Sequence, residues 1–147
     1  MATAASHTHP RASRRWQAFL LAAALPLFLG ALLCDNAYWS NYEIQWSNFA
    51  SWLMAGALVP AAVALVCALV DLLRASRRGG RPLAYFLLLL ATVALGFINA
   101  LVHARDAWAV MPIGLVLSVV VLVLASAATW LAFSNLAFAG SHVGELA

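Results

Sequence analysis

Four long apolar stretches alternate with short polar segments along the chain. A helix needs ~20 apolar residues to cross a hydrocarbon layer of ~30 Å. The stretches that qualify lie at residues 16–38, 48–73, 82–104 and 109–135. Within a single span, only a helix satisfies all of its own backbone polar groups. The sequence therefore predicts an all-α membrane protein, with four transmembrane helices in a compact bundle over residues 16–135.

The arginines predict how this bundle is oriented. Three of them precede the first span and four lie in the second connection. The first and third connections together contain a single arginine, Arg105. By the positive-inside rule, both termini and the middle connection face the cytoplasm. We expect a flexible cytoplasmic tail at 1–15 and a short cytoplasmic tail at 136–147. A cleaved signal peptide is the alternative for the first span, but the apolar run is long and no A-x-A site follows it.

The composition supports a membrane protein and argues against nucleic-acid binding. Hydrophobic residues make up 65% of the chain and charged residues 9%, against ~45–50% and ~25% in soluble domains. The net charge of +3 comes from short arginine clusters between apolar runs, which are typical of topology signals. We expect membrane lipids, other membrane-protein subunits or a second copy of the chain as partners, and no nucleic acid.

Small residues recur at helical spacing within the spans. Lipid provides no hydrophobic drive between helices, so close backbone approach at small residues holds them together. On the second to fourth spans the predicted packing seam comprises Ala57, Ala61, Ala64, Ala68, Gly96, Gly114 and Ser118. On the first span it comprises Ala23, Gly30 and Cys34.

Polar residues gather near the predicted outer ends of the spans. This predicted outer-leaflet cluster comprises Asp35, Asn36, Asn99, His103, Arg105 and Asp106. A histidine–carboxylate pair can relay protons, and ionisable groups inside membranes are often functional. In the alternative interpretation, Asn99 and His103 only fix the packing against the first helix, while Arg105 and Asp106 are solvated.

A second polar group is predicted at the cytoplasmic end of the second span. Asp71 lies near a helix C-terminus, where a carboxylate opposes the helix dipole and favours a nearby cation. Arg74 and Arg78 follow on the same helical face. We expect an ion pair that fixes the middle connection; a proton-uptake site is the alternative.

Sequence motifs for chemistry are missing. The chain has no glycine-rich phosphate loop, no HExxH and no nucleophile elbow. We therefore expect no catalytic activity, no cofactor and no metal site, and a role as an accessory or assembly subunit of a larger membrane complex. Two alternatives remain. One is an electron-transfer module with haem or quinone near His103, and the other is a small channel or transporter using Asp35, His103 and Asp71.

Several segments resemble the bacterial membrane family called domain of unknown function 2231. They are "GALLCDNAYW" at 30–39, "WSNFASWLMAG" at 46–56, Asp71, "NALVHARD" at 99–106 and "GLVLS" at 114–118. The resemblance implies a small multi-helix inner-membrane protein with a weak redox association. Many family members carry a His-Pro pair before the first span's proline segment, whereas this chain reads "LAAALPLF" at 21–28. That departure argues against metal or haem ligation.

Overall fold

The computed structural model describes residues 9–74, 80–105 and 110–144. Four helices dominate: α1 (His9–Asn41), α2 (Ile44–Arg74), α3 (Gly80–His103) and α4 (Ile113–Gly144). Each contains a segment long and apolar enough to cross a membrane, namely Arg14–Asn41, Ile44–Arg74, Gly80–His103 and Ile113–Ser134. No strand occurs in these described ranges. The predicted all-α fold with four candidate transmembrane helices is confirmed.

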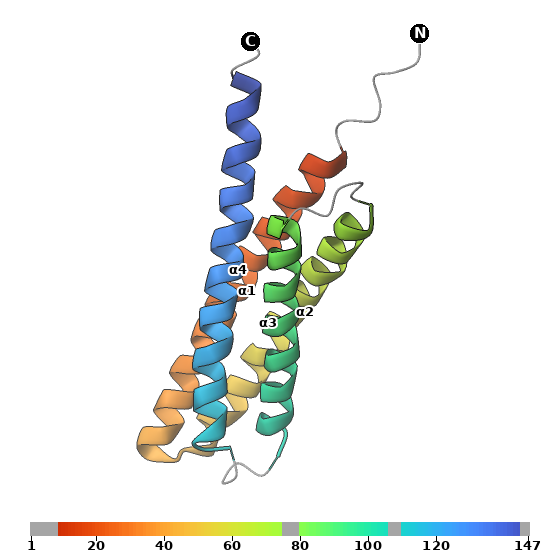
Figure 1. Ribbon diagram of the computed structural model, residues 1–147. Coiled ribbons are helices and arrows are strands. Elements are labelled where there is room, and N and C mark those ends of the chain that lie inside the picture. Colours follow the sequence, from red (N-terminus) through yellow and green to blue (C-terminus); the bar gives the residue numbers. More distant parts are fainter. Residues whose placement is uncertain (1–8, 75–79, 106–109, 145–147) are drawn as a thin grey trace.

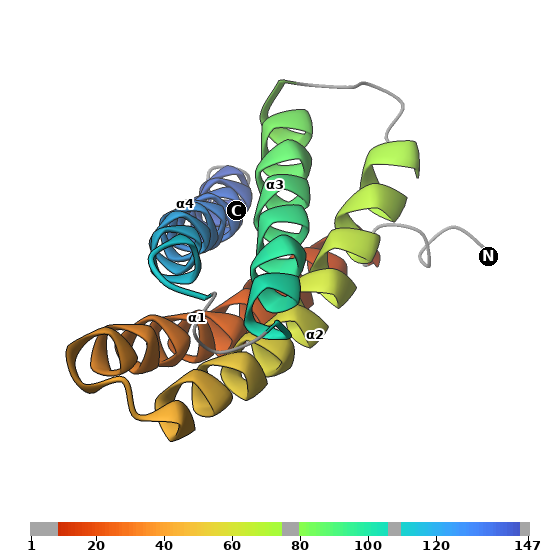
Figure 2. The same ribbon diagram turned by 90° about the horizontal axis from the view of Figure 1, so that it is seen from below.

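The helices form an up-and-down bundle in which each packs mainly against two neighbours. The contacting pairs are α1–α2, α2–α3, α3–α4 and α4–α1, so α1 and α3 lie on one diagonal (Figure 2). α1 begins and α4 ends at the same end of the bundle (Figure 1). We call this the arginine end, because Arg14, Arg15, Arg74 and Arg81 lie there, and we call the opposite end the hairpin end.

A tight turn joins α1 to α2 at the hairpin end. Tyr42 has a φ of 55°, in the left-handed region that glycine usually occupies after a helix. Its N–H donates to the Tyr38 carbonyl at 2.7 Å, and the Glu43 N–H donates to Asn41 Oδ1 at 3.0 Å. The first bond satisfies a carbonyl at the end of α1, and the second satisfies the Glu43 N–H just before α2, so the two bonds stabilise the turn between the helices.

The interior of the bundle is arranged in three layers. The layer nearest the arginine end contains Ala18, Leu21, Ala64, Ala68, Tyr85, Leu89, Ala128 and Ala132. The central layer contains Ala24, Phe28, Ala31, Met54, Ala57, Ala61, Val121 and Ala125. Buried polar side chains follow towards the hairpin end. Alanine lets the backbones approach closely, while Phe28 and Met54 fill the remaining central space.

The structure buries the small residues predicted for α2, α3 and α4. Ala57, Ala61, Ala64, Ala68, Gly96, Gly114 and Ser118 are all buried. The expectation for α1 is wrong for Ala23, which is exposed. Gly30 and Cys34 are half-buried, and a Cβ atom added at Gly30 would lie 3.2 Å from Leu53 Cδ1 on α2. The fully buried positions of α1 include Ala24, Ala31 and Asp35, and the buried hydrogen bonds of the Asp35 carboxylate favour this face.

Two helices extend past the predicted spans. α1 begins at His9, inside the segment expected to be a flexible tail, and α4 continues to Gly144. Spans estimated from apolar length end where polar residues begin. A helix, by contrast, can continue through residues that are not apolar, such as Arg11, Arg14 and Arg15 at the start of α1.

Candidate functional site

Four buried polar side chains from three helices meet near the hairpin end. Asp35 comes from α1, Asn99 and His103 from α3, and Ser118 from α4. Asn99 and His103 are four residues apart, so they lie on the same face of α3 as Gly96 and Thr92, which are also buried. We call these four residues the polar ring.

The hydrogen bonds of the polar ring form a closed path that begins at the Asn99 side chain and ends at the Asn99 backbone. Asn99 Nδ2 donates to Ser118 Oγ at 2.8 Å, and Ser118 Oγ donates to Asp35 Oδ2. Asp35 Oδ1 lies 2.7 Å from His103 Nε2, and His103 Nδ1 lies 2.9 Å from the Asn99 carbonyl oxygen. The ring therefore closes through the backbone of α3. Its Asp35–His103 contact crosses the bundle diagonal between α1 and α3.

The acceptors around His103 determine where its protons lie. A backbone carbonyl only accepts, so Nδ1 must carry a hydrogen and donate it to Asn99. The 2.7 Å hydrogen bond between Nε2 and Asp35 Oδ1 then needs one proton between the two atoms. With that proton the pair is neutral as a unit, either as imidazolium with carboxylate or as imidazole with carboxylic acid. Without it, a buried negative charge would face a nitrogen lone pair, which is costly in an apolar interior.

The polar ring is closed to solvent. The side chains of Asp35 and His103 both have 0% exposure, and Asn99 and Ser118 are also buried. A Cβ atom added at Gly114 would lie 3.1 Å from His103 Cε1 and 2.7 Å from Val110 Cγ1. The imidazole is thus packed tightly against the start of α4, and this packing fixes its orientation.

One acceptor of the ring is left over. Asn99 Oδ1 is buried and has no hydrogen-bond partner among the described residues. Exchanging the positions of Asn99 Oδ1 and Nδ2 would not give the oxygen a donor. The Ser118 hydroxyl already donates its hydrogen to Asp35, so it can only accept from Asn99. An unpaired buried acceptor costs about 1–3 kcal/mol, so the ring carries a penalty that a purely apolar layer would avoid.

A smaller polar contact lies at the arginine end. Gln17 Nε2 on α1 donates to Asp71 Oδ2 on α2 at 2.7 Å. Tyr85 on α3 lies in the neighbouring interior layer, and its hydroxyl has no hydrogen-bond partner in the described part of the chain. The central apolar layer separates this contact from the polar ring.

Comparison with known proteins gives a family and no activity. Residues 18–138 match the family described as "Predicted membrane protein (DUF2231)". The chain belongs to this family. No curated protein and no solved structure matches it. The family assignment agrees with the four apolar helices, so the protein is a membrane protein of the DUF2231 family.

Within this DUF2231 bundle, part of the predicted polar cluster comes together. Asp35, Asn99 and His103 meet, but Asn36 and Arg105 are exposed and do not belong to the buried ring. Asn36 directly follows Asp35 and therefore points about 100° away around α1. Arg105 lies beyond the last residue of α3. Asp106 lies outside the described residues.

The predicted ion pair of the DUF2231 chain is only partly described. Asp71 is half-buried and accepts a hydrogen bond from Gln17, a partner that the sequence analysis did not identify. Arg74 is exposed at the end of α2, and Arg78 lies outside the described residues. The pairing of Asp71 with Arg74 and Arg78 therefore stays a prediction.

The sequence pattern predicts Ser118 in the packing seam but does not predict its hydrogen bonds to Asp35 and Asn99. Its hydroxyl both accepts from Asn99 and donates to Asp35, so it links α4 to α1 and α3. A signal was present, since Ser118 lies four residues after Gly114 on the buried face of α4. Serine is both small and able to form hydrogen bonds, so helical spacing alone does not show whether a serine serves packing or hydrogen bonding.

The ring does not fit a haem or metal ligand set. Both nitrogens of His103 are engaged, one with Asp35 and one with a backbone carbonyl, so neither is available to coordinate iron. Among the described residues there is no group of three or more His, Cys, Asp or Glu side chains that could hold a metal ion.

Proposed function

We propose that this DUF2231 protein is a non-catalytic subunit that works by binding another membrane protein or a second copy of itself. The observation that carries the proposal is the closure of the polar ring. Its hydrogen bonds connect its members to one another, and its side chains have almost no exposed surface. Groups in this arrangement can lock helices together, but they cannot meet a substrate.

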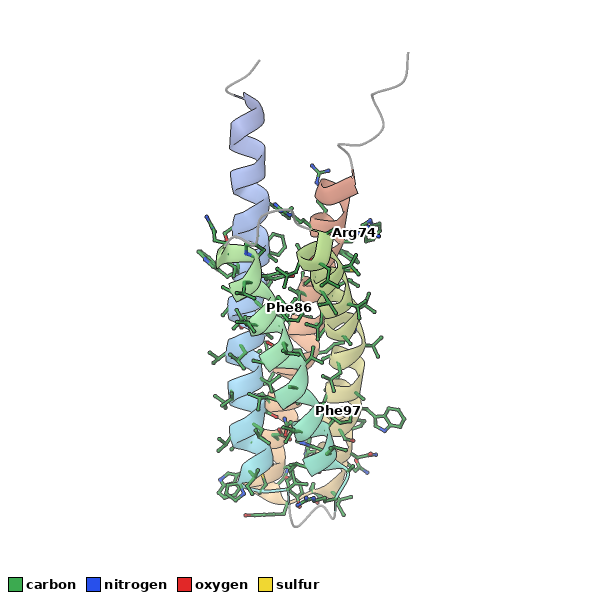
Figure 3. The ribbon with its side chains drawn as sticks, turned by 45° about the vertical axis from the view of Figure 1, so that its right-hand side comes forward. Arg74, Phe86 and Phe97 are labelled. Atoms are coloured by element: carbon green, nitrogen blue, oxygen red, sulfur yellow. The ribbon has the colours of Figure 1, made fainter. Side chains whose placement is uncertain are left out.

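The outer surface supports the same proposal. Large apolar side chains are exposed on all four helices, among them Leu29, Val59, Phe97 and Val123, and the α1–α2 turn is tight. Figure 3 shows such side chains along the bundle, with Phe86 and Phe97 marking two depths of α3. This surface suits lipid and the helices of a membrane partner. We therefore assign the proposed interaction to the outer faces of the bundle.

We also propose that both termini face the cytoplasm of a bacterial inner membrane. The support is the distribution of positive charge, because the exposed arginines of α1, α2 and α3 gather at one end of the bundle. In this orientation the polar ring lies in the outer leaflet.

Site-specific photo-cross-linking tests the partner proposal. A photoreactive amino acid would replace Leu29, Val59, Phe97 or Val123, one position on each helix, all exposed. We expect a discrete protein adduct on one or two faces, identified by mass spectrometry as the same partner or as the chain itself. Adducts with lipid alone at all four positions, together with a monomer in native mass spectrometry, would contradict the proposal.

Proton transfer is the second candidate function. The 2.7 Å contact between Asp35 Oδ1 and His103 Nε2 favours it, since a histidine–carboxylate pair inside a membrane can bind and release a proton. This role requires water to reach His103, whereas the central layer between the ring and Asp71 is apolar. The rate at which His103 reacts with a water-borne reagent therefore separates the two functions.

A further inference from the structure

Two arginines flank the contact between α1 and α2 at the arginine end. Gln17 and Asp71 are joined by a hydrogen bond of 2.7 Å. Arg14 lies three residues before Gln17 and Arg74 three residues after Asp71, which places each arginine on the same helix face as its neighbour in the contact. Both arginines are exposed, and Arg74 lies at the end of α2 (Figure 3).

The charge at this end is strongly one-sided. Arg14, Arg15, Arg74 and Arg81 are exposed there, while Asp71 is the acidic residue among the described side chains at this end and is half-buried. At the hairpin end, the exposed charges among the described residues are one of each sign, Glu43 and Arg105. Such a division is typical of membrane proteins, whose cytoplasmic connections carry an excess of arginine and lysine.

Exposed aromatic residues indicate the depth of these arginines. Trp16 is 65% exposed on α1 and Trp130 is 80% exposed on α4, both towards the arginine end. Tryptophan prefers the headgroup level of a bilayer, where its ring is half in hydrocarbon and half in water. Arg14 precedes Trp16 by two residues, so its guanidinium group can reach the phosphate level.

We infer that Arg14 and Arg74 form a binding site for the headgroup phosphate of an anionic phospholipid. The planar guanidinium group matches phosphate with two parallel hydrogen bonds. Two such groups, one from each helix, would hold the lipid across the α1–α2 contact. An anionic headgroup is favoured over a zwitterionic one, because the latter brings an ammonium group to a surface that is already positive.

Native mass spectrometry of the full chain from mixed bilayers tests this site. Nanodiscs would contain equal amounts of phosphatidylglycerol and phosphatidylcholine with identical acyl chains, and the ratio of the two retained lipids would be measured. Each arginine near a membrane surface is expected to favour the anionic lipid about fivefold. We expect wild type to prefer phosphatidylglycerol, and the double variant R14Q/R74Q to lose at least fivefold of that preference.

The opposite end of the bundle provides the matched control. R105Q removes one exposed arginine beside which no second described arginine lies, so it should lower the preference for phosphatidylglycerol less than R14Q/R74Q does. Unchanged helix content by circular dichroism would show that R14Q/R74Q is folded, as expected for exposed side chains. The inference is overturned by a wild type without preference, by a double variant that keeps it, or by an equal loss in R105Q.

Discussion

Asp35 and His103 are the residues on which the interior of this bundle depends. Each buries its polar atoms completely, and each is acceptable there because the other is present. A buried pair gives little net stability compared with apolar residues of the same shape, but loss of one partner leaves an uncompensated polar group. The pair therefore specifies how α1 and α3 meet across the diagonal more than it strengthens the fold.

A double-mutant cycle measures this dependence. We expect Asp35→Ala to lower the free energy of unfolding by about 3–5 kcal/mol, and His103→Ala to lower it similarly, because each leaves its partner unpaired. The double variant should cost much less than the sum of the two. The measurement is reversible unfolding in bicelles.

The control is Asn36→Ala, at the exposed neighbour of Asp35. It should change the free energy of unfolding by no more than ~0.5 kcal/mol. Strictly additive costs would mean that the two side chains do not interact.

At the scale of the helices, small residues determine how closely elements approach the polar ring. Gly114 is the sharpest case, since an added Cβ would lie 2.7 Å from Val110 Cγ1 and 3.1 Å from His103 Cε1. The imidazole cannot move aside easily, because both of its nitrogens are hydrogen-bonded. Gly56 on α2 provides a contrast, with 3.8 Å of space to Leu27 Cδ1.

Substituting these two glycines by alanine should give opposite results. Gly114→Ala is expected to destabilise the bundle by about 1–3 kcal/mol through overpacking. Gly56→Ala should be neutral or stabilise by up to ~1 kcal/mol, because alanine favours the helix and meets no obstacle. The same unfolding assay compares them. Equal stability of both variants would show that His103 is not held tightly against α4.

The sequence was sufficient for the four helices because a bilayer leaves few alternatives to a 20-residue apolar run. It was also sufficient for Asp35, Asn99 and His103, which stand out as polar residues at the ends of apolar spans. It could not resolve the buried face of α1. Ala22, Ala23 and Ala24 are consecutive, so small-residue spacing fits several faces, and only the partners of Asp35 decide among them. The Gln17–Asp71 bond joins residues 54 positions apart, and no local pattern indicates it.

Across the whole molecule, the hydrogen-bonded polar side chains of the ring are buried, and the helix faces that are exposed along the bundle are apolar. The polar ring joins α1, α3 and α4, whereas α2 lines the core with alanine and Met54. The arginine end carries the exposed positive charge, and the hairpin end is nearly balanced. In the function proposed above, such a molecule interacts through its helix faces and its charged rim. A variant that disturbs the polar ring should affect function only through the stability of the bundle.

The accessibility of His103 in lipid vesicles tests this account most directly. Diethylpyrocarbonate modifies imidazole nitrogens that water can reach, and peptide mass spectrometry reports the modification of His103 alone. The account predicts strong protection of His103 in the folded protein and rapid modification after unfolding in detergent, because its side chain has 0% exposure and both nitrogens are bonded. Modification at the same rate in the folded and unfolded protein would contradict it, and would indicate a water-filled site open to protons or ligands.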